Sequence, residues 1–259
     1  MDEANLLAAD EPPPVRVLHP DGASDLFLTA DHAGRDIPRR LGRLGVAESE
    51  LTRHIAWDIG IRGVTERLSA AFNATAVFQT YSRLVIDCNR APGVSSSIPE
   101  ISEHTVVPGN LGLRDAEKIA RVVGIFSPYH DRIGGLLDAR AAAGRRTVYI
   151  AMHSFTPTFK GESRAMEVGV LYNRDVRLAN ILLDLLRAEG GLTVGDNAPY
   201  AVSDLTDYGV PVHAERRGLP HVEIEIRQDL IADAAGEAAW ADRMARLLAV
   251  ADARLKAAR

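Results

Sequence analysis

The chain contains 259 residues, of which 46% are hydrophobic and 25% are charged, and its formal net charge is -5. This composition is typical of a globular protein, and α/β folds of this length often form one domain. No basic patch of the kind found in nucleic-acid-binding proteins is present. Cys88 is the only cysteine, which excludes both an intramolecular disulfide and a thiolate metal cage.

The first 14 residues are acidic and Ala-rich, and then Pro-rich, without the basic start and apolar stretch of a signal peptide. We therefore expect a flexible N-terminal arm at residues 1–14 and a single catalytic domain at residues 15–259. No apolar run is long enough to span a membrane. These features favour a cytoplasmic protein with neither a membrane nor a nucleic acid as partner, and they leave open whether it forms a homo-oligomer.

Short apolar runs rich in β-branched residues alternate along the chain with longer helical patterns. The runs predict strands at residues 26–30, 75–80, 84–87, 147–152, 168–172 and 222–226. The helical patterns cover residues 59–71, 115–143, 176–188 and 237–257, and Pro128 is placed to kink or divide the second of them. This alternation predicts an α/β fold of three layers, with a central mixed, mostly parallel sheet and helices on both faces.

Two histidines stand where predicted strands end. His32 follows the first strand, and His153 follows the strand at residues 147–152. Open α/β sheets bind ligands at the carboxyl ends of their strands, and a neutral imidazole is a common zinc ligand. One such histidine more often bonds loop backbone, but two at the same edge favour a metal site. A third ligand would be a carboxylate, Asp36 or Asp58, and spacing does not choose between them because Asp58 also suits a helix N-cap.

The segment at residues 221–227 places two acids inside a strand. By the two-residue period of a strand, Glu223 and Glu225 share one face, and aliphatic side chains occupy the other. Strand interiors disfavour acids, so the pair needs an explanation. Either the two acids lie on the solvated face of an edge strand, or a carboxylate here is a general base that acts on a metal-activated water.

Two arginines flank the predicted strand at residues 84–87. Arg83 precedes it and Arg90 follows it, with Asp87 and Asn89 near its end. The planar fork of arginine matches a carboxylate in bidentate fashion, which indicates a site for an acidic ligand. The alternative is a structural pair, in which these arginines and carboxylates satisfy one another.

Several of these segments together resemble the N-formylglutamate amidohydrolase family. The matching pieces, in chain order, are residues 31–38, 54–60, 82–90, 152–157, 195–200 and 223–231. They extend over most of the chain. The resemblance implies a fold similar to that of the zinc carboxypeptidases and aspartoacylase, with one bound zinc ion.

The resemblance also implies roles for individual residues. His32 and His153 match the zinc histidines of those enzymes, and Glu225 matches the late glutamate that acts as general base. Those relatives place a zinc glutamate three residues after the first histidine, where this chain has Arg35, so Asp58 is our expected third ligand. The expected substrate-binding residues are Arg83, Asn89, Arg90, Tyr200, His213 and Arg227.

The resemblance predicts a zinc-dependent amidohydrolase that cleaves the N-formyl or N-acyl amide of glutamate or a similar small acidic amino acid. One alternative keeps the fold but changes the substrate, as in a zinc carboxypeptidase or deacylase that acts on another N-acyl amino acid or peptide. A second is a non-catalytic module that binds acidic ligands through its arginines. A third is a serine hydrolase that uses Ser154 with a nearby histidine.

Overall fold

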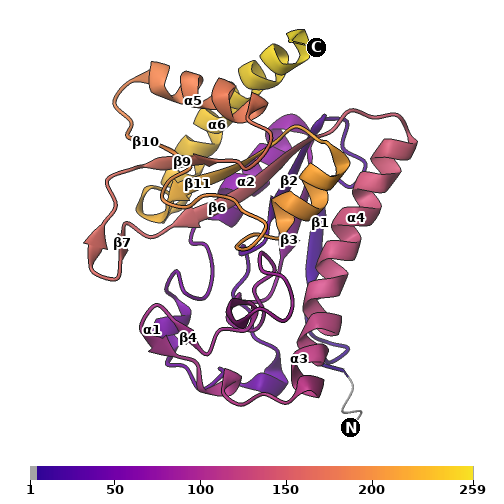
Figure 1. Cartoon of the computed structure of the whole chain (residues 1–259), viewed down its shortest axis with the longest axis vertical. Helices are drawn as coiled ribbons and strands as arrows, with labels where there is room; N and C mark the ends of the chain where they lie inside the picture. Colours follow the sequence, from indigo (N-terminus) through magenta and orange to yellow (C-terminus); the bar gives the residue numbers. More distant parts are fainter. Residues whose placement is uncertain (1–4, 259) are drawn as a thin grey trace.

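A seven-stranded mixed sheet forms the centre of the computed structural model, which describes residues 5–258 (Figure 1). From edge to edge the strands are β1 (Val15–Leu18), β3 (Thr75–Gln79), β2 (Leu26–Ala30), β6 (Val148–Phe155), β11 (His221–Arg227), β9 (Val168–Leu171) and β10 (Val194–Asp196). The four strands β3, β2, β6 and β11 are parallel to one another, whereas β1, β9 and β10 run in the opposite direction. The carboxyl ends of β2, β6 and β11 therefore meet at one edge.

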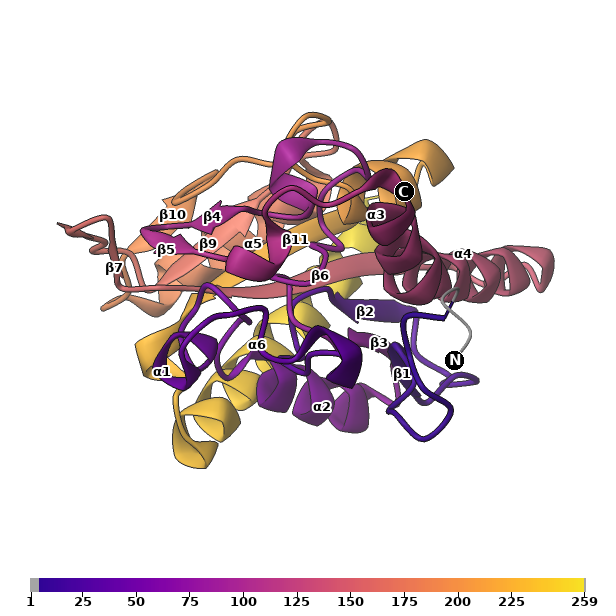
Figure 2. The ribbon, with the colours of Figure 1, turned by 90° about the horizontal axis from the view of Figure 1, so that it is seen from below.

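Helices cover both faces of the sheet. One face packs against α2 (Ile61–Phe72), α5 (Arg177–Glu189) and α6 (Ala234–Ala257), and the opposite face packs against α4 (Ser127–Ala142). Figure 2 shows α2 and α6 below the sheet and α4 above it. Every residue of β2, β3, β6 and β9 is buried, as expected for strands covered on both sides. The predicted three-layer α/β fold is confirmed.

One strand prediction is wrong, and another is confirmed but ends later than predicted. The apolar run at residues 84–87 forms turns rather than a strand, and Val85 N–H donates to the carbonyl oxygen of Ser82. Its side chains are buried all the same, because a short apolar run marks burial and not the backbone conformation that achieves it. Strand β6 also continues to Phe155, so His153 lies within the strand and not after it. The edge strands β1 and β10 were not predicted.

The helical pattern at residues 115–143 is divided, as the position of Pro128 predicted. Helix α3 (Asp115–Arg121) leads into a π-helical stretch at Val122–Phe126, and α4 begins at Ser127. Pro128 lies in the first turn of α4, directly after the π-helical stretch, and has no N–H to donate to the preceding turn.

Two short hairpins and the N-terminal segment lie outside the sheet. The hairpins are β4 (Ile101–Ser102) with β5 (Thr105–Val106), and β7 (Thr158–Phe159) with β8 (Glu162–Ser163), and a short helix, α1, spans Glu48–Leu51. Residues 5–14 of the expected arm lie against the domain: the side chain of Leu6 is buried, and the Tyr81 hydroxyl donates to Pro12 O at 2.7 Å. Across residues 5–258, no helix combines the length and the apolar character needed to cross a membrane.

Candidate metal centre and its cavity

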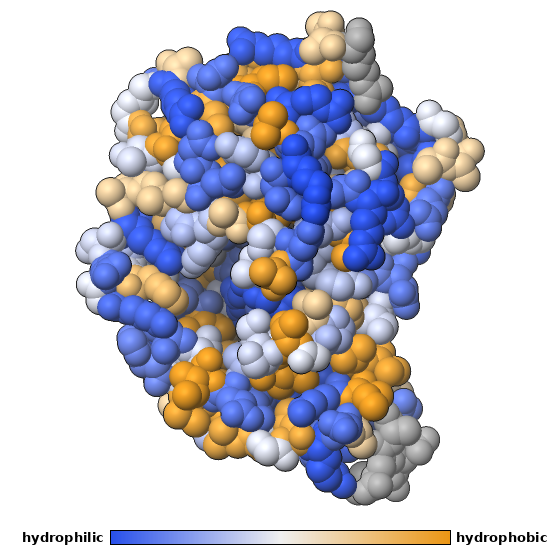
Figure 3. Space-filling model, viewed as in Figure 1, coloured by the Kyte–Doolittle hydropathy of each residue, from blue (hydrophilic) through white to orange (hydrophobic). Residues whose placement is uncertain are grey.

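A cavity of about 540 Å³ lies at the edge where three parallel strands end. His32 follows β2, His153 lies near the end of β6, and Glu225 on β11 is the register partner of His153. Figure 3 shows the hollow near the middle of one face of the molecule, with hydrophilic and hydrophobic residues around its mouth. Ligand sites occupy this edge in open α/β folds because side chains from several strands converge there.

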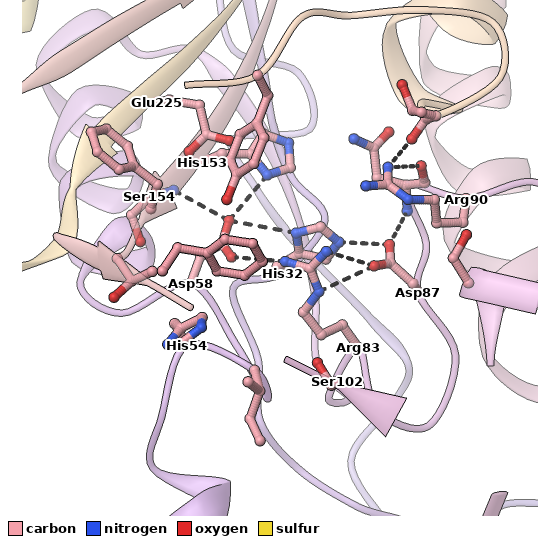
Figure 4. A pocket seen from close by; sticks show the side chains of 18 of the residues that line it. His32, His54, Asp58, Arg83, Asp87, Arg90, Ser102, His153, Ser154 and Glu225 are labelled. Atoms are coloured by element: carbon pink, nitrogen blue, oxygen red, sulfur yellow. Dashed lines mark hydrogen bonds and ion pairs between the residues drawn. The ribbon is translucent and has the colours of Figure 1, made fainter. Parts of the chain in front are cut away.

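His32, Asp58 and His153 come together at the base of this cavity (Figure 4). One potential ligand atom of each residue lies within 4.8 Å of the other two. Asp58 Oδ2 is 3.0 Å from His153 Nδ1 and 3.5 Å from His32 Nδ1. Asp36, the other candidate ligand, instead lines a separate depression beside Arg35.

Asp58 is oriented by the loop that precedes α2. Its N–H donates to His32 O at 2.9 Å, and its Oδ2 accepts from the N–H of Ser154 at 3.2 Å. The residue that caps α2 is Gly60, with φ of 78°, and a Cβ there would meet Ile231 O at 1.9 Å. Only glycine fits this close approach. The Asp58 carboxylate makes no cap bond to α2 and instead accepts from Ser154 within the site.

Two further aspartates lie behind the histidines. His32 Nε2 is 2.7 Å from Asp87 Oδ1, and His153 Nε2 is 3.9 Å from Asp31 Oδ2. The Tyr129 hydroxyl donates to the other oxygen of Asp31 at 2.5 Å. Each imidazole therefore turns Nδ1 toward Asp58 and Nε2 toward an outer carboxylate. His32 makes the outer hydrogen bond that orients metal-bound histidines, whereas His153 Nε2 faces Asp31 without a hydrogen bond.

The donor set fits a zinc-type ion. Two imidazoles and one carboxylate are common zinc ligands. His32 Nδ1, His153 Nε2 and Asp31 Oδ2 are buried and have no hydrogen-bond partner among the described residues. Burial opposes the charge on Asp58, but His32 and His153 outweigh it and hold the pKa of Asp58 well below its usual range. Burial and Arg83 lower the pKa of His32, yet Asp87 and Asp58 raise it overall. The site therefore attracts positive charge.

Asp31 should strengthen metal binding without touching the metal. Asp31→Asn keeps the shape of the side chain but removes the charge that faces His153 Nε2, so we expect the metal dissociation constant to rise about 10–100-fold. Competition with a chromogenic chelator measures this constant. Asp25→Asn is the control, because Asp25 pairs with Arg146 and Lys256 away from the cavity. Equal affinities of the Asp31→Asn variant and the unmodified protein would contradict this role.

Glu223 and Glu225 both face the cavity from β11, while Val222, Ile224 and Ile226 pack in the core. Strand β11 lies between β6 and β9, so the alternative of a solvated edge strand is wrong. Each acid is almost fully buried and has an Oε2 atom without a hydrogen-bond partner within residues 5–258. Burial raises the pKa of Glu225 well above its usual range and that of Glu223 to about 7.

The raised pKa of Glu223 predicts how the stability of the metal-free protein depends on pH. The pKa of Glu223 is about 7 in the folded state against 4.5 in the unfolded chain, so the folded state binds more protons between these values. Its contribution is fully present below pH 4.5 and is lost as the pH rises through 7, a change of up to about 3 kcal/mol. Urea unfolding at several pH values should show this trend. Glu223→Gln should remove this part of the slope and leave the part that comes from the raised pKa of Glu225. An unchanged pH slope in that variant would contradict the assignment.

The two arginines differ in how fully the protein engages them. Arg83 directs all three guanidinium nitrogens at protein carboxylates, with Nε and Nη2 on Asp87 and Nη1 on Asp58. Arg90 donates from Nη1 to the carbonyl oxygens of Asn89 and Thr206. The same Nη1 lies 3.6 Å from Asp207 Oδ1 in an ion pair, while Nε and Nη2 donate no hydrogen bond to a described residue. Arg83 thus forms a structural pair with protein carboxylates, which was the alternative to ligand binding. Arg90 keeps free donors at the cavity.

The cavity contains some of the other expected residues and not others. Asn89 and Tyr200 line it. His213 lies outside the lining, with Nε2 2.8 Å from His130 Nδ1, and Arg227 also lies outside it and pairs with Asp229. The Ser154 hydroxyl donates to Ile59 O at 2.9 Å, so it has no histidine base in this structure.

Sequence reasoning did not single out several residues that the fold brings to the site. Asp31 directly precedes His32, and this adjacency to a strand end was the available signal. His54 lies within a segment that resembles the family but was not chosen. Glu103 and Asp207 line the cavity from loops with no periodic pattern, so no local signal could have identified them.

Comparison with known proteins agrees with the fold and with the motifs. The family model for N-formylglutamate amidohydrolase matches residues 24–232. The crystal structure of gene product Atu2144 from Agrobacterium tumefaciens is 40% identical, covers 97% of this chain and 100% of its own, and has a TM-score of 0.93. The N-formylglutamate amidohydrolase from Ralstonia eutropha JMP134 is 18% identical, covers 93% and 98% of the two chains, and has a TM-score of 0.66. A search of curated proteins returned no match. With the match extending over most of its length, the chain belongs to the N-formylglutamate amidohydrolase family.

Proposed function

We propose that this protein is a zinc-dependent amidohydrolase that cleaves the N-acyl amide of glutamate or a similar acidic amino acid. One observation carries the proposal: His32, Asp58 and His153 converge beside the buried Glu225 in a chain of this family. A non-catalytic binding module would need neither this donor set nor a buried acid beside it.

His32, Asp58 and His153 would hold the ion. A zinc ion bound by such residues polarises a carbonyl group and lowers the pKa of a water molecule. Glu225 faces the same cavity, and its Oε2 has no hydrogen-bond partner among residues 5–258, so it can accept a proton from the attacking water. Burial raises the pKa of Glu225, which favours the protonated form that then donates to the leaving amine nitrogen. The positive charge of Arg83, held beside Asp58, favours negative charge on the reacting oxygen.

Arg90 would bind a carboxylate of the substrate. It lies apart from Glu225, beyond His32 and Asp87 in Figure 4, and its Nε and Nη2 are the donors left by its own contacts. Asn89 supports this end of the cavity, because its side chain bonds Asp207 and the N–H groups of Tyr208 and Gly209.

Replacing Arg90 should change specificity. Arg90→Lys keeps the charge but loses the planar fork, so kcat/KM for N-acyl glutamates should fall by an amount equivalent to about 2–5 kcal/mol if the pair is desolvated. The loss should be smaller for an analogue in which a neutral amide replaces the carboxylate. Equal losses for the acidic and neutral substrates would indicate that Arg90 only holds the loop at Thr206.

Metal analysis combined with an activity assay tests the proposed function as a whole. We expect about one zinc ion per chain and release of formate from N-formyl-L-glutamate, with activity lost in chelator and restored by Zn²⁺. Activity that persists after complete metal removal would exclude the metal mechanism. A metal-loaded protein that hydrolyses no N-acyl glutamate would exclude the proposed substrate.

A further inference from the structure

The cavity has two ends of different chemistry. Arg90, Asn89, Thr206 and Asp207 form the polar end. The rest of the lining includes a group of large apolar side chains, which we call the aromatic end: Ile101, Phe155, Phe159 and Tyr200. The proposed metal centre and Glu225 need none of these four side chains, so the aromatic end calls for a separate explanation.

The three rings of the aromatic end are held together by Arg164. Its guanidinium carbon is 4.8 Å from the ring centres of Phe159 and Tyr200 and 5.8 Å from that of Phe155. Its Nη1 also donates to the Tyr200 hydroxyl at 2.8 Å. Arg164 does not line the cavity, so it supports the rings from outside and leaves their cavity sides free.

The two hairpins complete this end. The N–H of Lys160, in the β7–β8 hairpin, donates to Glu103 in the β4–β5 hairpin at 3.1 Å. Phe159 makes an edge contact with His54 at 6.4 Å between ring centres. At the mouth, Ile101 is 62% exposed and Tyr200 is 43% exposed. Exposed apolar side chains gathered at the mouth of a cavity are typical of a surface that a ligand covers.

The aromatic end lies on the Glu225 side of the metal centre. Phe155 follows Ser154, whose N–H bonds Asp58, and Phe159 contacts His54. In Figure 4, Ser154 and His54 lie on the same side as Glu225, and Arg90 lies on the other. A substrate with its carboxylate at Arg90 and its amide at the metal centre would therefore direct the rest of its acyl group toward the aromatic end.

A formyl group has no carbon beyond the carbonyl and would leave these rings in contact with water. We propose that the acyl group of the natural substrate is larger than formyl and apolar, of the arylacyl class, and packs against Phe155, Phe159 and Tyr200. This inference rests on the proposed function. The reaction stays a simple hydrolysis: the amide C–N bond breaks, the water oxygen joins the acyl carbon, and the amine takes a proton, which releases an arylalkanoate and glutamate.

A series of acyl groups on one amino acid tests the proposal. The zinc-loaded full chain is assayed for glutamate release from the N-formyl, N-acetyl, N-hexanoyl and N-phenylacetyl derivatives of L-glutamate. Burial of an aromatic side group predicts a kcat/KM about 10–100-fold higher for phenylacetyl than for formyl. A maximum at formyl, with a decline toward larger groups, would overturn the inference and leave the proposed function intact.

Binding separates a failure of the inference from a failure of the proposed function. Calorimetry with the zinc-loaded protein compares N-phenylacetyl-L-glutamate with N-formyl-L-glutamate. If neither is hydrolysed but the phenylacetyl compound binds at least about tenfold tighter, the proposed reaction is wrong and the aromatic end is supported. If the phenylacetyl compound binds no tighter, the aromatic end is refuted whatever the enzyme does.

Substitutions test whether the side chains of the aromatic end cause the preference for the phenylacetyl substrate. Phe159→Ala should lower kcat/KM for the phenylacetyl substrate about tenfold more than for the formyl substrate. Ile101→Ala should act in the same direction with a smaller effect. Its matched control is Ile119→Ala, since Ile119 is 59% exposed on α3 and does not line the cavity. Equal losses on the two substrates in the Phe159→Ala variant would mean that Phe159 only supports the hairpin, which would overturn the proposal.

Discussion

Glu225→Gln should lower turnover about 10²–10⁴-fold, the usual contribution of a general base, while the bound metal stays in place. The change keeps the shape of the side chain and removes its ability to accept a proton. Glu225 is not among the three residues that would hold the ion, so the zinc content should match that of the unmodified protein. Single-turnover hydrolysis together with metal analysis measures both quantities.

Glu223→Gln is the matched control for this prediction. Glu223 lies on the same face of β11, is equally buried and also lines the cavity. Glu225 is the residue that pairs in register with His153 of β6, and Glu223 lies two residues earlier in β11. Loss of Glu223 should therefore affect turnover far less. A larger loss in Glu223→Gln than in Glu225→Gln would transfer the base role to Glu223.

Asp58→Ala should abolish metal binding at the concentrations used for the assay, and activity with it. Asp58 is the only carboxylate that approaches both histidines at Nδ1 within the described residues, so its removal takes away one of three ligands. We expect the zinc dissociation constant to rise by more than the ~100-fold upper range typical of outer carboxylates. Dialysis against buffered zinc, followed by metal analysis, measures the loss.

Asp36→Ala provides the comparison. Asp36 satisfied the sequence criteria for a third ligand as well as Asp58 did, but its side chain lies in a separate depression. Its removal should leave the metal content and turnover unchanged. Loss of zinc in Asp36→Ala, with zinc retained in Asp58→Ala, would reverse the assignment.

Local patterns were sufficient for the features that depend on neighbouring residues. The period of two at residues 221–227 places Glu223 and Glu225 on one face, and the structure has them there. The alternation of strands and helices predicted the layers, because each element needs one buried face. The strand ends at His32 and His153 marked the ligand edge, although β6 extends past His153 to Phe155.

Only the tertiary structure decided what depends on contacts between distant segments. Asp58 reaches the histidines because its loop bonds His32 and Ser154, and Ser154 is 96 residues farther along the chain. Whether β11 is an edge or an interior strand, and so whether its acids are solvated or buried, depends on β9 pairing beside it. Arg83 and Arg90 are alike in sequence context, yet Asp58 and Asp87 engage all three guanidinium nitrogens of Arg83. Spacing along the chain carries no information on such pairings, because they form only when loops far apart in the sequence close onto one another.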